Sequence, residues 1–147
     1  MERIKGVTLI ELMVAILIVS ILAAAVVSTM QGRIDKAKWS EANATAGTIR
    51  RAVRAYAAET DVATAQTLAG NDLSDADTRE ALGFGDIDLE GTYFIAANYT
   101  LSSVEASAAC VVTVEGTKPN APSGIYQLTA DGDWEMQSQD GGGGEDG

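Results

Sequence analysis

Residues Val7 to Val27 form an apolar run that constrains the fold more than any other part of the sequence. The run holds 21 positions and only one ionisable side chain, that of Glu11. A helix of this length, rising ~1.5 Å per residue, would be about 31 Å long, close to the ~30 Å hydrocarbon core of a bilayer. Arg3 and Lys5 precede the run, so the positive-inside rule keeps the N-terminus in the cytoplasm and exports the remainder. The sequence therefore predicts one membrane-spanning helix that carries an exported domain.

A cleaved signal peptide is the alternative interpretation of this run, because Ala23-Ala24-Ala25 could be a small-residue cleavage site. The run is long for a signal peptide, however, and no turn-forming residue separates it from the sequence that follows. We therefore expect the helix to be retained.

Glu11 is the feature of this helix that calls for an explanation. A carboxylate inside a bilayer costs a few kcal/mol on insertion scales, so an intramembrane glutamate is a candidate functional residue. The alternative is that Glu11 lies near enough to the membrane surface to be partly hydrated, or is protonated. The sequence around Glu11 favours a function.

The sequence Lys5-Gly6-Val7-Thr8-Leu9-Ile10-Glu11-Leu12, followed by an unbroken apolar helix, resembles the class III signal of type IV pilins and type II secretion pseudopilins. In that family a dedicated membrane peptidase removes a short basic leader after the glycine, the new N-terminus is methylated, and a glutamate five residues in is kept. The resemblance implies cleavage between Gly6 and Val7, methylation of Val7 and a role for Glu11 in subunit assembly. It is strong over about the first 30 residues, and elsewhere it extends only to the general layout.

Cleavage after Gly6 would leave a positive α-amine at the head of the helix, about one turn from the negative Glu11. In a polymer, the glutamate of one subunit would face the amine of a neighbour, and this pairing would relieve the cost of burying both charges. A subunit out of register would bury an unpaired charge, so we expect the pair to set the register between subunits.

Three features depart from the family's commonest pattern. Val7 stands where phenylalanine or methionine is usual, no proline interrupts the helix near Ser28, and a single cysteine excludes the C-terminal disulfide of many major pilins. That cysteine, Cys110, lies in an apolar run, and the chain has no histidine to activate it. We predict that Cys110 is a buried small hydrophobic residue.

The helical pattern continues beyond the membrane run to about Ala58. Arg50, Arg51 and Arg54 lie on other faces than the apolar one and are expected to be solvated. The apolar residues recur at steps of three and four, as one packed helix face requires: Ile34, Ala37, Ala42, Ala46, Ile49, Val53, Tyr56 and Ala57.

Beyond the long helix we expect one short helix and a small antiparallel sheet. Ser74 is a candidate N-cap for a helix from about Asp75 to Leu82. Asp131-Gly132 predicts a hairpin turn. The strand-like runs, rich in β-branched or aromatic residues, are 92–99, 101–105, 109–114, 125–130 and 133–137. The predicted fold class is therefore α+β and pilin-like, with one long N-terminal helix, half transmembrane and half packed, against a small antiparallel β-sheet.

The exported part of the chain is acidic. The formal net charge is −11, from 10 basic and 21 acidic residues, and beyond Glu80 a single basic residue, Lys118, stands against 11 acidic ones. Nucleic-acid binding requires a basic footprint, so no nucleic-acid partner is expected. Acidity that keeps an exported domain soluble is the simpler interpretation, and binding of a divalent cation is the alternative.

Asp131, Asp133 and Glu135 place three carboxylates at alternate positions. Calcium takes six to eight oxygen ligands, and alternate acidic residues in a loop can supply several of them. Because related major pseudopilins carry a calcium ion near the C-terminus, the resemblance makes these three residues candidate calcium ligands. The alternative is a tight turn with solvent-facing acidic side chains. No other cofactor is expected.

The sequence divides into four expected segments: a leader at 1–6, a transmembrane and assembly helix at 7–30, an exported pilin-like α+β domain at 31–138, and a disordered glycine-rich tail at 139–147. It contains no histidine, no glycine-rich phosphate loop and no paired nucleophile and base, so we do not expect an enzyme.

The resemblance leaves three functions open. The first is a structural subunit of the periplasmic pseudopilus that drives protein export in a type II secretion system. The second is a type IV pilin of a surface fibre for adhesion, motility or DNA uptake, and the third is a monomeric membrane-tethered binding domain. The missing disulfide, the compact domain and the acidic C-terminal loop favour the first.

The first function implies three partners, namely prepilin peptidase, a polymer of this chain with other pseudopilins, and an inner-membrane assembly platform. It also implies a single-pass protein of the bacterial inner membrane. Its N-terminus would be cytoplasmic, and its C-terminal domain periplasmic or extracellular.

Overall fold

The structure is a computed structural model that describes residues 6–137, without the side chains of Ser28 and Thr29. Most of the expected leader and the whole glycine-rich tail therefore lie outside the described residues. The chain divides into two compact units, Met1–Ala37 and Lys38–Gly147. Helix α1 (Leu9–Glu59) begins in the first unit and ends in the second.

Within the described residues, the first unit consists of Gly6 to Thr8 and the N-terminal part of α1. It contains a stretch that is long and apolar enough to cross a membrane, by length and composition, and none of that stretch is buried by other parts of the protein. Large apolar side chains such as Leu9 and Ile10 are therefore exposed all around the helix. A helix that is apolar on every side is typical of one surrounded by lipid or by other helices.

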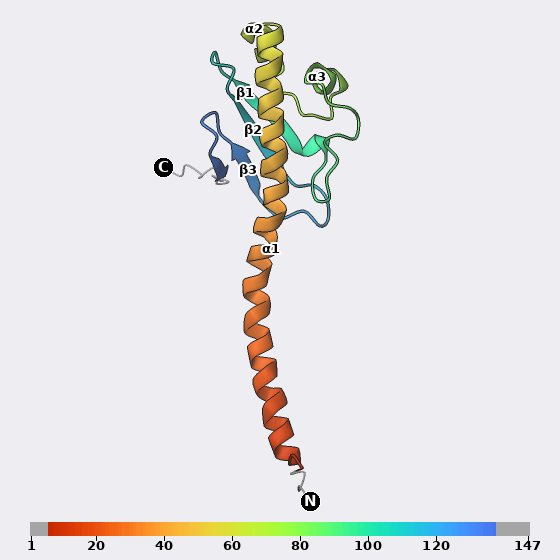
Figure 1. Cartoon of the computed structure of the whole chain (residues 1–147), viewed down its shortest axis with the longest axis vertical. Coiled ribbons are helices and arrows are strands. Elements are labelled where there is room, and N and C mark those ends of the chain that lie inside the picture. Colours follow the sequence, from red (N-terminus) through yellow and green to blue (C-terminus); the bar gives the residue numbers. More distant parts are fainter. Residues whose placement is uncertain (1–5, 138–147) are drawn as a thin grey trace, which may run out of the picture. The chain divides into compact units, whose positions relative to one another are not determined.

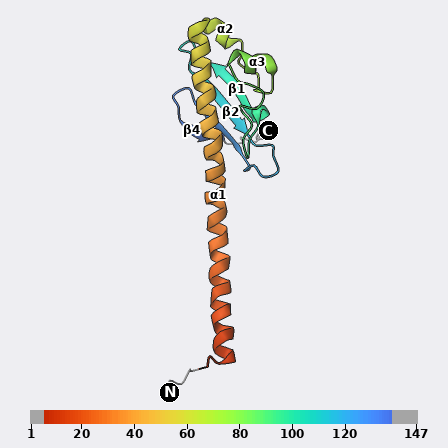
Figure 2. The same ribbon diagram turned by 45° about the vertical axis from the view of Figure 1, so that its right-hand side comes forward.

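The second unit is one helix on one sheet. The C-terminal part of α1, orange to yellow in Figure 1, runs along one face of the sheet, as the turned view in Figure 2 also shows. The strands are β1 (Tyr99–Val104), β2 (Cys110–Glu115), β3 (Ile125–Leu128) and β4 (Trp134–Met136), and they pair in the order β1-β2-β3-β4. All three pairings are antiparallel, which confirms the predicted α+β, pilin-like class.

The core of this unit lies between α1 and the sheet. Ala46, Ile49 and Val53 of α1 are fully buried, as are Val112 and Val114 of β2. The apolar face expected from the helical pattern is confirmed from Ala42 to Ala57, except that Tyr56 is only half-buried. Small alanines on the helix leave room for the larger side chains of the strands in the core between helix and sheet.

Two residues of the expected face, Ile34 and Ala37, are exposed, so the prediction that they are packed was wrong. Both belong to the first unit. Trp39, which the pattern missed, is buried at the start of the second unit and lies 5.1 Å, centroid to centroid, from Phe94 and 4.4 Å from Tyr126. Aromatic contacts of this kind add to the free energy gained by burial.

A β-bulge in β1 aligns its side chains with the core. Leu101 pairs with Val112, but Ser103 pairs with Val111, so Ser102 is an extra residue in the ladder. Strict alternation would have placed Ser103 in the core after Leu101. The bulge restores the alternation one residue later, so that Val104 is buried instead.

The short helices differ from those expected. Helix α2 (Val62–Gln66) lies in a region for which no helix was predicted, and Asp61 caps it by accepting a 2.7 Å hydrogen bond from the backbone N–H of Thr64. Helix α3 (Ala76–Ala81) is present, but its N-cap is Asp75. The prediction of Ser74 as the cap was wrong, because the N–H of Ser74 instead donates to the carboxylate of Asp72 in a turn.

The strand expected over 92–99 is absent from the described structure, and only its last residue joins β1. Residues Ala96–Asn98 form the 3-10 helix η1. In a strand, the backbone N–H groups of this segment would bond to a neighbouring strand; here they donate to side chains instead. The carboxylate of Glu41 accepts hydrogen bonds from the N–H groups of Tyr93 and Phe94 at 3.0 and 3.3 Å, and the Asn98 amide oxygen accepts from the N–H of Ile95 at 2.8 Å.

Charged side chains on α1 tie the loops to the helix. Lys38 Nζ donates to the carbonyl of Asn120 at 2.9 Å, and the Arg50 guanidinium donates to the carbonyl of Ala130 beside the β3–β4 turn. Arg50 is therefore half-buried and bonded, and the prediction that it is solvated was wrong, whereas Arg51 and Arg54 are exposed as expected.

Candidate functional site

The start of α1 is set by Thr8. Residues Gly6, Val7 and Thr8 are not helical, and Thr8 Oγ1 accepts a 3.3 Å hydrogen bond from the backbone N–H of Glu11. The carbonyl of Thr8 accepts the first helical bond, from the N–H of Leu12 at 3.1 Å. Thr8 is thus an N-cap, which stabilises a helix by satisfying one of its free N–H groups.

Sequence reasoning missed the role of Thr8, although a signal for it was present. Threonine followed three residues later by glutamate, as at Thr8 and Glu11, is the sequence pattern of a capping box. The cap places the start of the helix just after the Gly6–Val7 peptide bond, so that cleavage there would leave the new N-terminus at the head of α1.

The predicted cleavage position is accessible. Gly6 and Val7 are exposed, and a Cβ atom built on Gly6 would meet no heavy atom within 4 Å. The described structure would therefore accept a side chain at position 6. A requirement for glycine at this position would have to come from another molecule, as recognition by a peptidase would provide. Cleavage itself remains a prediction.

Glu11 lies in the first turn of α1 and its side chain is exposed among apolar neighbours such as Ile10 and Leu12. A negative charge is favourable near a helix N-terminus, where the helix dipole is positive. An α-amine at the same end would be unfavourable for the same reason. Glu11 is therefore suited to pair with an amine, and its role in assembly remains a prediction.

A second polar side chain in the apolar stretch is satisfied within its own helix. Ser20 Oγ donates a 2.6 Å hydrogen bond to the carbonyl of Ile16. A serine bonded in this way needs no external partner in a membrane. Ser20 therefore carries no comparable argument for pairing between subunits, and Glu11 does.

The hairpin predicted at Asp131-Gly132 is confirmed. Gly132 adopts a positive φ of 105°, which favours glycine, and its N–H donates to the carbonyl of Thr129 at 3.0 Å. The N–H of Asp133 donates to Thr129 Oγ1, also at 3.0 Å, and strands β3 and β4 continue from this turn as an antiparallel pair.

The carboxylates of Asp131, Asp133 and Glu135 are exposed around this turn. Within residues 6–137, no group of three or more acidic, histidine or cysteine side chains is gathered closely enough to hold a metal ion. The Arg50 guanidinium bonded to Ala130 already places a positive charge beside the turn. Calcium binding stays a prediction of the sequence.

Cys110 is fully buried on β2, as predicted, and burial raises the pKa of its thiol to about 11. The nucleophilic form of cysteine is the thiolate, so this side chain is unreactive near pH 7. It belongs to the core rather than to a site.

Comparison with known proteins identifies the N-terminal segment. Residues 1–27 match the family described as the prokaryotic N-terminal methylation motif. No curated protein and no solved structure matches the chain. The match covers the Gly6–Val7 bond, the Thr8 cap and Glu11, so the features of this site fall within one known processing segment.

Proposed function

From the prepilin-type cleavage and methylation segment that this chain shares with type IV pilins and pseudopilins, we propose that the protein is a structural subunit of a periplasmic pseudopilus in a type II secretion system. The motif implies processing by prepilin peptidase and assembly into a pilin-type polymer, and together with the apolar part of α1 it fits a membrane-anchored protein. The observation that carries the proposal is this motif directly before a helix whose apolar side chains are exposed on every side.

In this proposal each segment has one task. Residues 1–6 are the leader, which prepilin peptidase removes at the accessible Gly6–Val7 bond, and Val7 is then methylated. Residues 7–30 anchor the subunit in the inner membrane and later pack in the polymer. Residues 31–138 form the exported domain in the periplasm, with the glycine-rich segment 139–147 as its tail.

Glu11 supplies the register of the polymer in this proposal. Its carboxylate pairs with the Val7 α-amine of a neighbouring subunit, a contact that the exposed position of Glu11 on α1 allows. In surroundings of low dielectric constant, an unpaired charge is strongly unfavourable, whereas a pair in good geometry offsets much of that penalty. The proposed role is structural, because the motif implies assembly into a pilin-type polymer.

The choice of a pseudopilus rests on weaker features of the sequence. A chain with one cysteine cannot form the internal disulfide of many major pilins, and its exported part is acidic. The same N-terminal motif occurs in type IV pilins, so a surface fibre for adhesion, motility or DNA uptake is the second candidate. The partners expected for the first candidate are other pseudopilins and an inner-membrane assembly platform.

Deletion of the gene in the native bacterium tests the proposal. We expect exported enzymes to accumulate in the periplasm while surface fibres, seen by electron microscopy, persist. Re-expression of the unchanged chain should restore export, and this is the control. Loss of surface fibres with normal export would contradict the pseudopilus and favour the pilin, and a processed chain that stays monomeric in the membrane would contradict both.

A further inference from the structure

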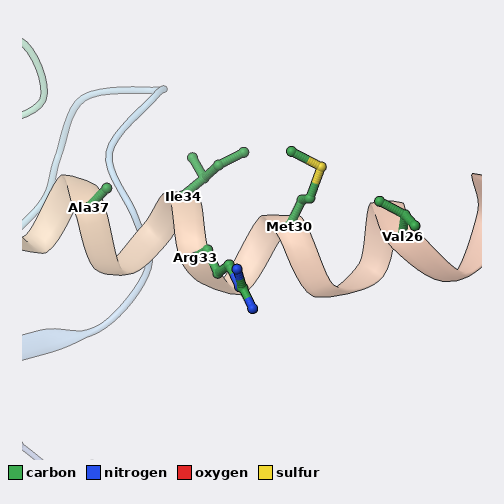
Figure 3. Close-up of a pocket in the computed structure, with 5 residues that line it drawn as sticks. All are labelled: Val26, Met30, Arg33, Ile34 and Ala37. Atoms are coloured by element: carbon green, nitrogen blue, oxygen red, sulfur yellow. The ribbon is translucent and has the colours of Figure 1, made fainter.

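The first unit carries a shallow apolar groove on one side of α1. Its lining consists of Val26, Met30, Arg33, Ile34 and Ala37, which are spaced by three or four residues and so share a helix face (Figure 3). Met30 is 54% exposed and Ile34 is 48% exposed. The Arg33 side chain extends to the other side of the helix from those of Met30 and Ile34 (Figure 3), so it places a positive charge at one edge of the α1 groove.

The second unit carries a matching projection. Ile87 is 79% exposed, the largest value among the exposed large hydrophobic side chains of the described residues. It lies in a turn, residues 85–91, that also contains the exposed acidic residues Asp86, Asp88 and Glu90. The Asp86 carboxylate is paired with the Arg79 guanidinium at 2.5 Å. The Ile87 turn therefore presents one apolar side chain beside the carboxylates of Asp88 and Glu90, which form its acidic rim.

Hydrogen bonds hold the Ile87 turn in place. The Asp88 carboxylate accepts from the N–H of Gly85 at 2.7 Å, and the N–H of Glu90 donates to the carbonyl of Ile87 at 3.1 Å. Lys118 Nζ donates to the carbonyl of Gly91 at 2.7 Å. Leu89 is buried beneath the turn. Because both ends of the turn are fixed, the turn loses less conformational entropy on binding than a flexible loop would. This lower cost favours binding through the Ile87 turn.

We propose that Ile87 of one subunit packs into the α1 groove of the next subunit, with the acidic rim of the Ile87 turn facing Arg33. The two surfaces are complementary in chemistry, because each has an exposed apolar part and their charged edges have opposite signs. The α1 groove is a contiguous exposed apolar surface with a charged residue at its edge, and surfaces of this kind mark interaction sites. This inference rests on the proposed function, since it needs a polymer of the chain.

Every copy of the chain carries both the α1 groove and the Ile87 turn, so a second copy can supply the partner surface for each. They are different surfaces on different units of the chain, so the contact is head-to-tail rather than self-complementary. Contacts of that kind repeat without closing when no ring forms, and they build open filaments. The contact lies more than four helical turns along α1 from Glu11, so it is separate from the pairing of Glu11 with an amine.

Disulfide cross-linking of the full chain tests this contact. The variant carries Met30→Cys and Ile87→Cys and is expressed together with a prepilin peptidase and the assembly system. Every copy then holds both halves of the contact, so mild oxidation should give a ladder of linked multimers on a non-reducing gel. The native Cys110 is buried and remains in all samples, and the otherwise unchanged chain shows its background.

The matched control pairs Ile87→Cys with Asp35→Cys. Asp35 is five residues beyond Met30, which places it about 140° around the helix and away from the groove. We expect no ladder from this control. A second variant, Ile87→Ser, removes the apolar contact at an exposed position, so it should leave the melting temperature unchanged and weaken subunit assembly by about tenfold, whereas Ile87→Leu should assemble normally.

The outcomes separate this inference from the proposed function. If the unchanged chain polymerises but the Met30 and Ile87 pair links no better than the Asp35 and Ile87 pair, the inference is overturned and the polymer stands. If the Met30→Cys thiol is shielded from a water-soluble reagent yet forms no links, the groove belongs to the lipid and the inference also fails. If the unchanged chain never polymerises, both proposals fail.

Discussion

Leu17 and Phe94 are both large apolar side chains, and they stand in opposite surroundings. Leu17 is 60% exposed on the part of α1 that belongs to the first unit, whereas Phe94 is fully buried in the second, in contact with the rings of Trp39 and Tyr99. The second unit thus covers most of its own apolar residues, with Ile87 and Met136 as exposed exceptions, whereas the first unit leaves its apolar residues for lipid or another protein molecule to cover. The exposed apolar side chains of the first unit indicate that it functions in contact with lipid or other subunits. The buried apolar side chains of the second unit stabilise its fold.

The largest expected difference between the two units concerns Glu11. Glu11→Ala should leave membrane insertion and the folded second unit unchanged, but it should abolish assembly. Removing one partner of a buried pair leaves an uncompensated charge, which costs about 3 kcal/mol or more, a loss on the order of a hundredfold in affinity. The measurement is the polymer fraction after membrane extraction, with Ser20→Ala as the control, because Ser20 bonds within its own helix. Normal assembly of Glu11→Ala would refute the role of the pair.

Truncating the two apolar side chains compared above is the second test. Phe94→Ala removes a fully buried ring and should lower the free energy of unfolding of the second unit by about 3–5 kcal/mol. Leu17→Ala should change it by less than about 0.5 kcal/mol, because Leu17 lies outside that core. Both tryptophans, Trp39 and Trp134, belong to the second unit, so their fluorescence during denaturation of the full chain reports that unit alone. Equal effects of the two substitutions would contradict the division into units.

A smaller effect is expected from acid, again in the second unit. Hydrogen bonds from the backbone N–H groups of Thr64 and Thr78 lower the pKa of Asp61 and Asp75 below the usual 3.8. The folded state therefore binds these protons less readily than the unfolded state. Their stabilising contribution is complete above pH 3.8 and is lost as the pH falls through the folded-state values.

The melting temperature of the second unit, followed by tryptophan fluorescence, should thus be insensitive to these two caps between pH 7 and 5 and decrease below about pH 4. The variant with Asp61→Ala and Asp75→Ala should melt lower at pH 7 and lose less on acidification. An acid dependence unchanged by the two substitutions would count against the caps as its source.

The smallest effect is expected from calcium. Asp131, Asp133 and Glu135 are exposed, and Arg50 places a positive charge beside the same turn. If the site that the sequence predicts is present, added calcium should raise the melting temperature of the full chain by a small amount, and Asp131→Asn should abolish that rise. A melting temperature unchanged by calcium and by a chelator would contradict the site.

The parts of the fold that the sequence predicted are those with strong local patterns. The apolar run, the packed helix face from Ala42 to Ala57 and the Asp131-Gly132 hairpin each follow from residue spacing, and the structure has all three. Cys110 was also placed correctly, because an apolar run without an activating histidine leaves a cysteine little alternative to the core.

The errors arose where contacts distant in sequence override local pattern. Residues 92–99 look like a strand, but Glu41, about fifty positions earlier, binds the N–H groups of Tyr93 and Phe94. Arg50 looked solvated, but its partner is the carbonyl of Ala130. Neither partner is visible in a local window of sequence. The Thr8 cap differs, because its pattern was local and was overlooked.

The central claim is that the chain is processed after Gly6 and used with its helix attached. Intact mass spectrometry of the protein extracted from its native membrane tests this claim most directly. The expected mass lacks Met1 to Gly6 and carries one added methyl group on Val7. A mass that still includes the leader, or one that shows the whole apolar helix removed near Ala25, would contradict the account.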